Sequence, residues 1–238
     1  MTKILIADDE PDLLEIIAME LELADFETIS VDCGRDAIEV LRKDSSIDAV
    51  LSDIRMPNGT GTDILEDLIT RNYKIPMIFM SGFSDITKES ALASGAYAYF
   101  NKPTNMQNVI SKLKNVTKPI HERWGNKKDA TAAISPLKLA FSSYEEAKTA
   151  EAISLGIGGF LFKDGQNALR EGDILDFEIP IKEGETLIGQ GIVQWQSQGP
   201  SGAKLCGIEF DYLTSDSMKL YHALVAQKPL KPYIPHSF

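Results

Sequence analysis

Residues 47–61 read Ile-Asp-Ala-Val-Leu-Ser-Asp-Ile-Arg-Met-Pro-Asn-Gly-Thr-Gly. In this stretch a short apolar run, residues 49–51, leads to the acid Asp53, and a loop rich in proline and glycine follows. The pattern is typical of a buried parallel strand that delivers one carboxylate to its C-terminal end. Open α/β sheets bind their ligands outside that edge. We therefore expect Asp53 to lie in a binding site, with a turn-capping acid as the simpler alternative.

Three further apolar runs end in polar residues. They are residues 3–7, followed by Asp8 and Asp9; residues 76–80, followed by Ser81; and residues 96–101, followed by Lys102 and Pro103. Adjacent acids repel each other, so stability explains the pair poorly, whereas Mg²⁺ binding explains it well because this ion prefers carboxylate oxygens. Convergence of acids, a hydroxyl and a lysine on Asp53 predicts phosphoryl transfer, in which the metal and the ammonium neutralise phosphoryl charge while the carboxylate attacks.

The order Asp-Asp, Asp-x-x-x-Pro-x-x-x-Gly, Ser and Lys-Pro resembles the receiver domain of two-component response regulators, over residues 1–117. The resemblance implies an α/β fold of the flavodoxin-like type with a five-stranded parallel sheet. It implies that Asp53 accepts the phosphoryl group and that Ser81 and Lys102 contact it. Tyr99 would be the aromatic switch, turning inward behind Ser81. The implied Mg²⁺ ligands are Asp8, Asp9 (directly), Asp53 and the backbone carbonyl of Arg55. A cis Lys102–Pro103 bond is also implied.

Composition and charge favour a two-domain cytoplasmic protein. The length of 238 residues suggests two domains. The net charge is −11, with 20 acids and 11 Lys/Arg in residues 1–117 (−9) and 15 acids and 13 Lys/Arg in residues 118–238 (−2). Neither half has the basic balance of a DNA-binding module. Cys33 and Cys206 lack metal-ligand or disulfide spacing, which fits a reducing cytoplasm.

No segment predicts export or membrane insertion. The chain runs directly into a strand without the apolar region of a signal peptide. The uncharged and largely apolar stretch at residues 152–162 has eleven residues, which is too short for a membrane span.

After residue 135 the apolar period changes from that of helices to that of strands. Residues 175, 177 and 179 are apolar and alternate with their neighbours, as are residues 206, 208 and 210. Short alternating runs separated by turn signals predict a small antiparallel barrel. A helix over about 215–226 follows. We therefore predict a linker at 118–134, in which Trp124 docks on one domain, a barrel domain at 135–227 and an extended proline-rich tail at 228–238.

Residues 135–227 resemble a PilZ domain, an all-β six-stranded barrel with a C-terminal helix. The resemblance is carried by residues 169–175, 191–193 and 206–210. PilZ domains typically bind cyclic di-GMP through Arg-x-x-x-Arg and Asp/Asn-x-Ser-x-x-Gly. Here Lys127 replaces the second arginine after Arg123, and Ala152 replaces the acid before Ser154. Because lysine substitutes poorly for arginine in bidentate contacts, we expect weak binding or none. Any binding would use Arg123, Lys127 and Ser154.

These patterns predict a two-component response regulator with Mg²⁺ as cofactor, phosphorylated on Asp53 by a sensor histidine kinase. Its second domain would act by contact with an unidentified protein, with no DNA and no membrane insertion. The alternative is a cyclic di-GMP effector under control of receiver phosphorylation. We expect no enzyme activity beyond slow self-dephosphorylation, because a haloacid dehalogenase-type phosphatase needs a second Asp where Arg55 stands. A transcription factor is disfavoured because no helix-turn-helix pattern follows the receiver.

Overall fold

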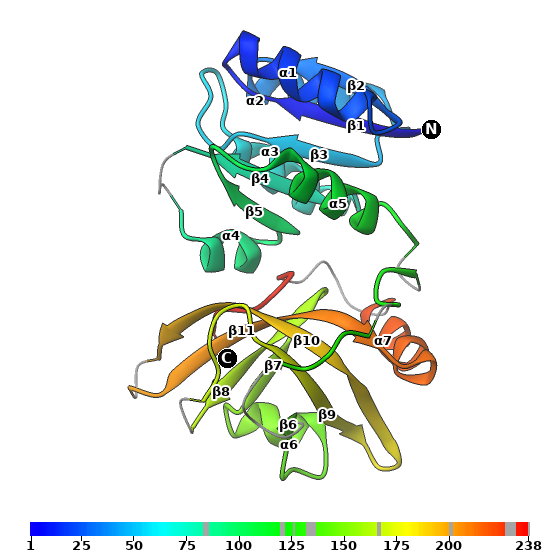
Figure 1. The fold of residues 1–238 in the computed structure, drawn as a ribbon, viewed down its shortest axis with the longest axis vertical. Helices are drawn as coiled ribbons and strands as arrows, with labels where there is room; N and C mark the ends of the chain where they lie inside the picture. The colour runs from blue at the N-terminus through cyan, green and yellow to red at the C-terminus, as the bar shows by residue number, and fades with distance from the viewer. Residues whose placement is uncertain are drawn as a thin grey trace. The chain divides into compact units, whose positions relative to one another are not determined.

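Strands and helices alternate along residues 1–118, which form the first of two units in the computed structural model (Figure 1). The strands are β1 (Thr2–Ala7), β2 (Phe26–Val31), β3 (Ala49–Ser52), β4 (Met77–Ser81) and β5 (Ala98–Asn101). The helices are α1 (Pro11–Glu22), α2 (Gly34–Lys43), α3 (Gly61–Thr70), α4 (Lys88–Ser94) and α5 (Met106–Val116). The structure describes residues 1–82, 86–119, 122–125, 127–131, 137–165, 168–199, 202–226 and 232–237.

The five strands form a parallel sheet in the order β2-β1-β3-β4-β5. This is the flavodoxin-like order, so the fold expected for the first unit is confirmed. Every residue of β3 and β4 is buried, which agrees with apolar runs that are covered on both faces of a sheet. Helix α1 contacts α5, and α2 contacts α3.

The loop after β3 is shaped by Gly61. A Cβ atom at this position would lie 2.2 Å from the backbone oxygen of Asp53, so only glycine fits without a shift of the backbone. Directly before it, Thr60 caps α3 in a reciprocal capping box with Asp63. The start of α3 is therefore packed tightly against Asp53, the residue that the sequence predicts at the centre of the site.

Helix α4 is short. It begins after Thr87, whose side chain caps it, and ends at Gly95, which has a φ of 114°. The sequence predicts its start near Asp85, which lies outside the described residues. Ala91 and Leu92 are its buried residues, so little apolar surface holds it to the sheet.

The second unit comprises Pro119–Phe238. Its strands are β6 (Leu137–Lys138), β7 (Ile153–Leu155), β8 (Gly159–Asp164), β9 (Ile174–Lys182), β10 (Glu185–Gln198) and β11 (Lys204–Leu213), and its helices are α6 (Tyr144–Thr149) and α7 (Ser215–Ala226). The sheet order is β6-β9-β10-β11-β8-β7.

The prediction of an all-β antiparallel barrel is wrong in two respects. Strand β6 pairs with β9 in parallel, so the sheet is mixed, and helix α6 stands between β6 and β7. Among the described residues β6 and β7 are the two ends of the strand order, so the sheet is a half-barrel. Helix α6 has six residues, with Tyr144 and Ala147 buried, which is too short to show a helical period in the sequence. The six strands and the C-terminal helix agree with the prediction.

Part of the predicted linker belongs to the core of the second unit. Trp124 is 3% exposed and packs edge-to-face on Phe210 and Tyr221, with ring centroids 5.4 and 5.9 Å apart. The backbone N–H of Leu213 donates to the Trp124 carbonyl over 3.1 Å, and that of Lys128 donates to the Gln190 side chain over 2.8 Å. Residues 120–121, 126 and 132–134 of this segment lie outside the described residues.

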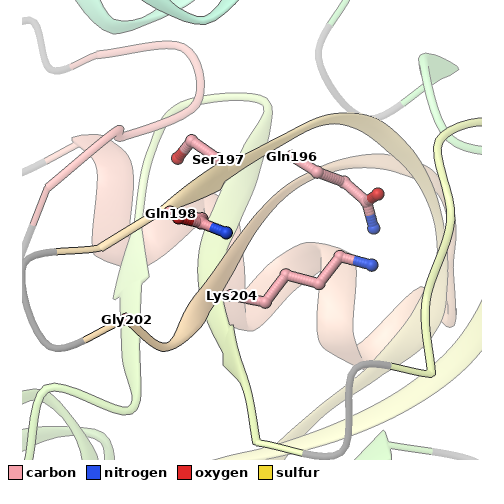
Figure 2. A pocket seen from close by; sticks show the side chains of 5 residues that line it. All are labelled: Gln196, Ser197, Gln198, Gly202 and Lys204. Atoms are coloured by element: carbon pink, nitrogen blue, oxygen red, sulfur yellow. The ribbon is translucent and has the colours of Figure 1, made fainter.

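A polar hollow lies on the β10–β11 hairpin (Figure 2). Gln196, Ser197, Gln198, Gly202 and Lys204 line it. The side chains of Gln196 and Lys204 both donate to the backbone carbonyl of Leu169 over 2.6 Å, so these donors serve the fold.

None of the described helices combines the length and the apolar character that crossing a bilayer requires.

Candidate functional site

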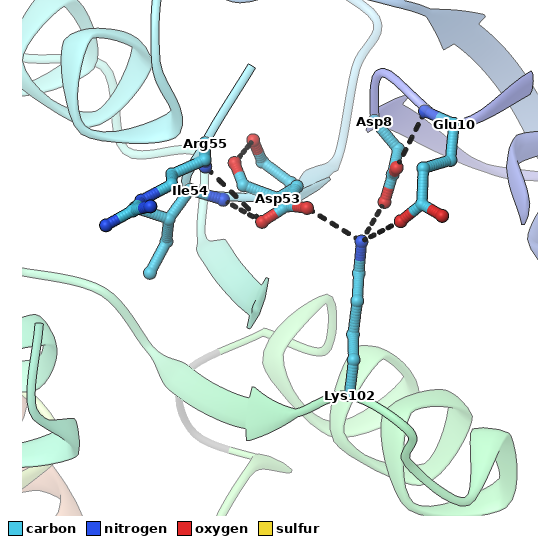
Figure 3. Close-up of polar contacts among 7 residues, drawn as sticks. Asp8, Glu10, Asp53, Ile54, Arg55 and Lys102 are labelled. Carbon is cyan, nitrogen blue, oxygen red and sulfur yellow. Dashed lines mark hydrogen bonds and ion pairs between the residues drawn. The ribbon is translucent and has the colours of Figure 1, made fainter. Parts of the chain in front are cut away.

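The carboxyl ends of four strands bring the predicted polar residues together. Asp8 follows β1, Asp53 follows β3, Ser81 ends β4, and Lys102 follows β5. Because β3 lies between β1 and β4 in a parallel sheet, these ends meet at one edge. Figure 3 shows the side chains of Asp8, Asp53 and Lys102 pointing toward one another.

The Lys102 ammonium lies among the acids. Its Nζ atom is 2.6 Å from Oδ2 of Asp8, 2.7 Å from Oδ2 of Asp53 and 3.6 Å from Oε1 of Glu10. The Asp8 side chain is 1% exposed and that of Lys102 is 14% exposed. Short charge-assisted hydrogen bonds of this kind offset the free-energy cost of burying charged groups.

Burial and ion pairing act in opposite directions on these groups. Burial alone lowers the pKa of the Lys102 amine, but its hydrogen bonds to Asp53 and Asp8 outweigh burial and raise that pKa above its ordinary value. Burial raises the pKa of the Asp8 carboxyl, and the hydrogen bond from Lys102 offsets only part of this effect. The lysine therefore stays charged at neutral pH and compensates the acids.

The two oxygens of Asp53 have different environments. Oδ1 accepts hydrogen bonds from the backbone N–H groups of Ile54 and, over 3.4 Å, of Arg55. Oδ2 accepts from Lys102. The carboxylate is therefore fixed by the backbone on one side and presents its other oxygen to a cation, which is a suitable orientation for nucleophilic attack on a phosphoryl group.

The remaining predicted residues lie close by in sequence and sheet. Ser81 is 2% exposed, and its backbone carbonyl accepts from the N–H of Lys102 over 2.8 Å. Tyr99, on β5, is 8% exposed and belongs to the core of the first unit. The Lys102–Pro103 peptide bond is cis. The roles assigned to Ser81, Tyr99 and the Arg55 carbonyl stay predictions.

The acidic cluster fits a divalent metal ion, with one difference from the prediction. Carboxylate oxygens of Asp8, Glu10 and Asp53 lie within 4.8 Å of one another. Such hard oxygen donors are those that Mg²⁺ prefers. The predicted direct ligand Asp9 is outside this group of described residues, and Glu10 stands in it instead. The backbone N–H of Glu10 donates to Oδ1 of Asp8 over 3.1 Å, which helps to place it.

The fold and the site agree with the family comparison. The family model described as the response regulator receiver domain matches residues 4–114. Residues 4–114 form a response regulator receiver domain. The acidic pocket is the place where receiver domains typically bind Mg²⁺.

Curated relatives match about half of the chain. The transcriptional regulatory protein CpxR of Klebsiella pneumoniae is 28% identical over 137 residues, 57% of each chain. The response regulator SaeR of Staphylococcus epidermidis is 31% identical over 120 residues, 49% of this chain and 50% of SaeR. The chain thus spans about half the length of these relatives. A solved Francisella receiver domain is 26% identical, with 49% of this chain and 97% of that chain covered and a TM-score of 0.47.

The three residues considered for cyclic di-GMP lie in the second unit. Lys127 pairs with Asp176 on β9, with Nζ and Oδ1 3.3 Å apart. Ser154 lies on β7, at one end of the sheet order, and Arg123 directly precedes the buried Trp124. Strands β10, β11 and β8 separate β9 from β7 in the sheet order. The resemblance to PilZ domains stays a prediction.

Proposed function

We propose that this chain is a two-component response regulator whose receiver domain accepts a phosphoryl group on Asp53 from a sensor histidine kinase. The observation that carries the proposal is the Asp53 carboxylate, which is fixed by backbone N–H groups at Oδ1 and paired with Lys102 at Oδ2. In the transfer, an Asp53 oxygen forms a bond to phosphorus while the bond from phosphorus to the kinase histidine breaks, giving an acyl phosphate.

The receiver's own residues prepare this step. Backbone donation from Ile54 and Arg55 holds the carboxylate plane. The Lys102 ammonium pairs with the Asp53 oxygen before the transfer and is close enough to pair with a phosphoryl oxygen after it. A Mg²⁺ ion held by Asp8, Asp53 and a neighbouring acid would supply further positive charge beside the phosphoryl oxygens. Removal of either the Lys102 ammonium or the Mg²⁺ ion should therefore slow the transfer.

Phosphorylation of Asp53 would change the local charge, and a nearby surface would change its structure in response. A phosphoryl group adds close to two negative charges and three acceptor oxygens beside Ser81 and Lys102. The surface around α4 and β5 is the readout that we propose, with Tyr99 as the switch residue. Helix α4 buries only Ala91 and Leu92 among its described side chains, so it is weakly held and easily shifted.

The phosphorylation proposal is tested with a small phosphoryl donor. The protein is incubated with acetyl phosphate, with and without Mg²⁺, and its intact mass is measured. We expect one added phosphoryl group with Mg²⁺, little without it, and none in Asp53→Asn. Asp216→Asn is the matched control, because the Asp216 side chain is 97% exposed on α7. Equal labelling of Asp53→Asn and the wild type would reject the assignment.

We propose that the second unit acts as a protein-interaction module. Its half-barrel sheet packs around an aromatic core, and its net charge of −3, from 15 acids and 12 Lys/Arg in residues 119–238, offers little to an anionic partner. Transcriptional regulation is the second candidate, because the name of CpxR states that role for the relative. Binding to mixed-sequence DNA at low salt separates the two. Salt-sensitive submicromolar binding would favour the transcriptional candidate.

Control by cyclic di-GMP is the alternative for the second unit. The turn that it would use, residues 152–159, is covered at Gly156 and Gly158 by the C-terminal segment. This cover and the replacement of the second arginine by Lys127 both argue for weak binding. Calorimetric titration of the full chain with cyclic di-GMP tests this directly. Micromolar or tighter binding that is lost in Arg123→Ala would replace our proposal with the ligand-sensing one.

A further inference from the structure

The C-terminal segment, residues 232–237, is bound to the turn between β7 and β8 (red in Figure 1). The backbone N–H groups of Ile157 and Gly158 donate to the carbonyls of Pro232 and Tyr233, each over 2.9 Å. The Tyr233 hydroxyl donates to Oε1 of Glu209 over 2.7 Å. Tyr233 is 4% exposed and Ile234 is fully buried. This part of the predicted tail is therefore packed, whereas residues 228–231 and 238 lie outside the described residues.

Two glycines make room for this segment. A Cβ atom on Gly158 would lie 2.0 Å from the Tyr233 ring, and one on Gly156 would lie 2.6 Å from the carbonyl oxygens of Pro232 and Tyr233. Neither glycine has a left-handed backbone conformation. Close approach of the segment, and not the local backbone geometry, therefore requires glycine at both positions.

The segment lies on the outer face of the half-barrel. Along β11, Cys206, Ile208 and Phe210 point into the inner core, so Leu205, Gly207 and Glu209 face the other way. Glu209 is the residue that accepts the Tyr233 hydroxyl, which places the tyrosine on this outer face.

Apolar side chains continue this outer face. Gly207 pairs with Leu161 on β8 and with Trp195 on β10, so both flank it on the same side of the sheet. Leu161 is fully buried, and Trp195 is 3% exposed with its indole over Gly207. The Trp195 indole N–H is buried without a hydrogen-bond partner among the described residues. The face thus combines buried apolar side chains, two backbone donors and a carboxylate that the segment engages, and one donor without a partner among the described residues.

We propose that this outer face is a docking site for an extended peptide of a partner protein, and that residues 232–237 are a strap that occupies it until such a peptide displaces them. The fitting peptide has a hydroxylated aromatic residue followed by an aliphatic one, because Glu209 receives the hydroxyl and the glycines leave space for the ring. Backbone recognition at Ile157 and Gly158 gives affinity, and the ring position gives specificity.

The strap sets the threshold for a partner. A tethered segment competes at an effective concentration in the millimolar range, so a free peptide with the same contacts binds the intact chain only weakly. A partner peptide that also brings an acceptor to the Trp195 indole N–H satisfies a donor that the strap leaves unpaired, and gains affinity over the strap. The inference rests on the proposed interaction role of the second unit and does not require phosphorylation of Asp53.

The test supplies the strap in trans. A fluorescent peptide with the sequence of residues 232–238, Pro-Tyr-Ile-Pro-His-Ser-Phe, is titrated into the intact chain and into a chain that ends at Lys231. We expect the shortened chain to bind at least ~10-fold more tightly than the intact chain. Gly158→Ala in the shortened chain should abolish binding, because the added methyl takes the ring position. Gly165→Ala is the matched control, since a Cβ atom there meets nothing within 4 Å.

A second variant keeps the test decisive if the shortened chain does not fold. Tyr233→Ala in the full chain removes the ring but keeps the backbone bonds to Ile157 and Gly158, so it should bind the peptide more tightly than the wild type and less tightly than the shortened chain. Equal, weak binding by Tyr233→Ala and the wild type would overturn the proposal and make the segment a fixed part of the fold. No phosphoryl donor is present, and Asp53 labelling of the same proteins is measured separately, so failure here leaves the phosphorylation proposal untouched.

Discussion

Lys102 donates to Asp53 over 2.7 Å, although β3 and β5 deliver the two residues from strands that are separated by β4. The same ammonium donates to Asp8 over 2.6 Å. One lysine thus compensates two buried carboxylates whose oxygens lie within 4.8 Å of each other. The carboxylate that we propose as phosphoryl acceptor and the stability of the receiver therefore both depend on the Lys102 side chain.

Replacement of Lys102 by methionine should destabilise the receiver. The variant leaves Asp8 and Asp53 buried without a cation, and we expect a loss of about 2–4 kcal/mol in the free energy of unfolding at pH 7. Because folding raises the pKa of the amine, the contribution is fully present at pH 7 and is lost only as the pH rises past 10.5 toward the folded value. Urea denaturation measures the loss. Lys43→Met, at a side chain that is 76% exposed, should change stability by less than about 0.5 kcal/mol.

A methyl group at Gly61 should misplace Asp53. Gly61→Ala puts a Cβ atom 2.2 Å from the Asp53 carbonyl oxygen, so the loop after β3 has to move. We expect phosphorylation by acetyl phosphate to slow by at least ~10-fold, because displacements of about 1 Å at a reacting group have costs of this order or larger. Gly82→Ala is the matched control near the same site, since its Cβ atom would lie 3.9 Å from Lys102. Normal labelling rates in both variants would show that the loop is not tightly constrained.

The convergence of four polar residues in the receiver can be predicted from the sequence because parallel strands bring their carboxyl ends together. Asp8, Asp53, Ser81 and Lys102 each follow or end an apolar run, so convergence follows from the fold class alone. Glu10 is different. It is exposed and comes directly after the adjacent acids Asp8 and Asp9, which are the more obvious candidates for ligands. Its backbone N–H donates to Asp8, and no periodicity in the sequence predicts this hydrogen bond.

The second unit is less predictable from its sequence because short elements and distant contacts define it. Helix α6 is too short for a periodic signal, and β6 has only two residues. The glycines at 156 and 158 indicate a close approach or a bend, but they do not indicate that Tyr233 is the residue that approaches. The aromatic Trp124 in a polar segment is a clear signal of docking, and the structure places it in this core.

The buried thiol of Cys206 should make the second unit less stable at alkaline pH. Burial raises the pKa of this thiol from 9.0 to about 11. The folded protein therefore holds the thiol proton more tightly than the unfolded chain does, and stability falls as the pH rises from 9 to 11, by at most about 3 kcal/mol. The free energy of unfolding at pH 8 and pH 11 should show this fall in Cys33→Ser and a smaller fall in Cys33→Ser/Cys206→Ala. Parallel falls in both variants would assign the pH dependence to other groups.

Trp124 should decide whether the segment after the receiver stays attached to the second unit. Its ring lies edge-to-face against Phe210 and Tyr221, and its carbonyl accepts from Leu213. Trp124→Ala removes this packing, and we expect a loss of about 3–5 kcal/mol in the unfolding free energy of the second unit. Trp124→Phe keeps part of the ring contact and should cost less. Ile188→Ala, at a side chain that is 43% exposed, is the control and should cost far less than Trp124→Ala.

Hydrogen exchange locates the effect. The Lys128 amide donates to the Gln190 side chain, and the Leu213 amide donates to the Trp124 carbonyl. Both amides should exchange faster in Trp124→Ala, whereas amides of β1 and β3 in the receiver should not change. Such a result means that the described residues around Trp124 open locally while the strands of the second unit and the receiver stay folded. Faster exchange throughout β9–β11 would instead show that loss of the Trp124 ring destabilises the whole second unit and not only the segment around it.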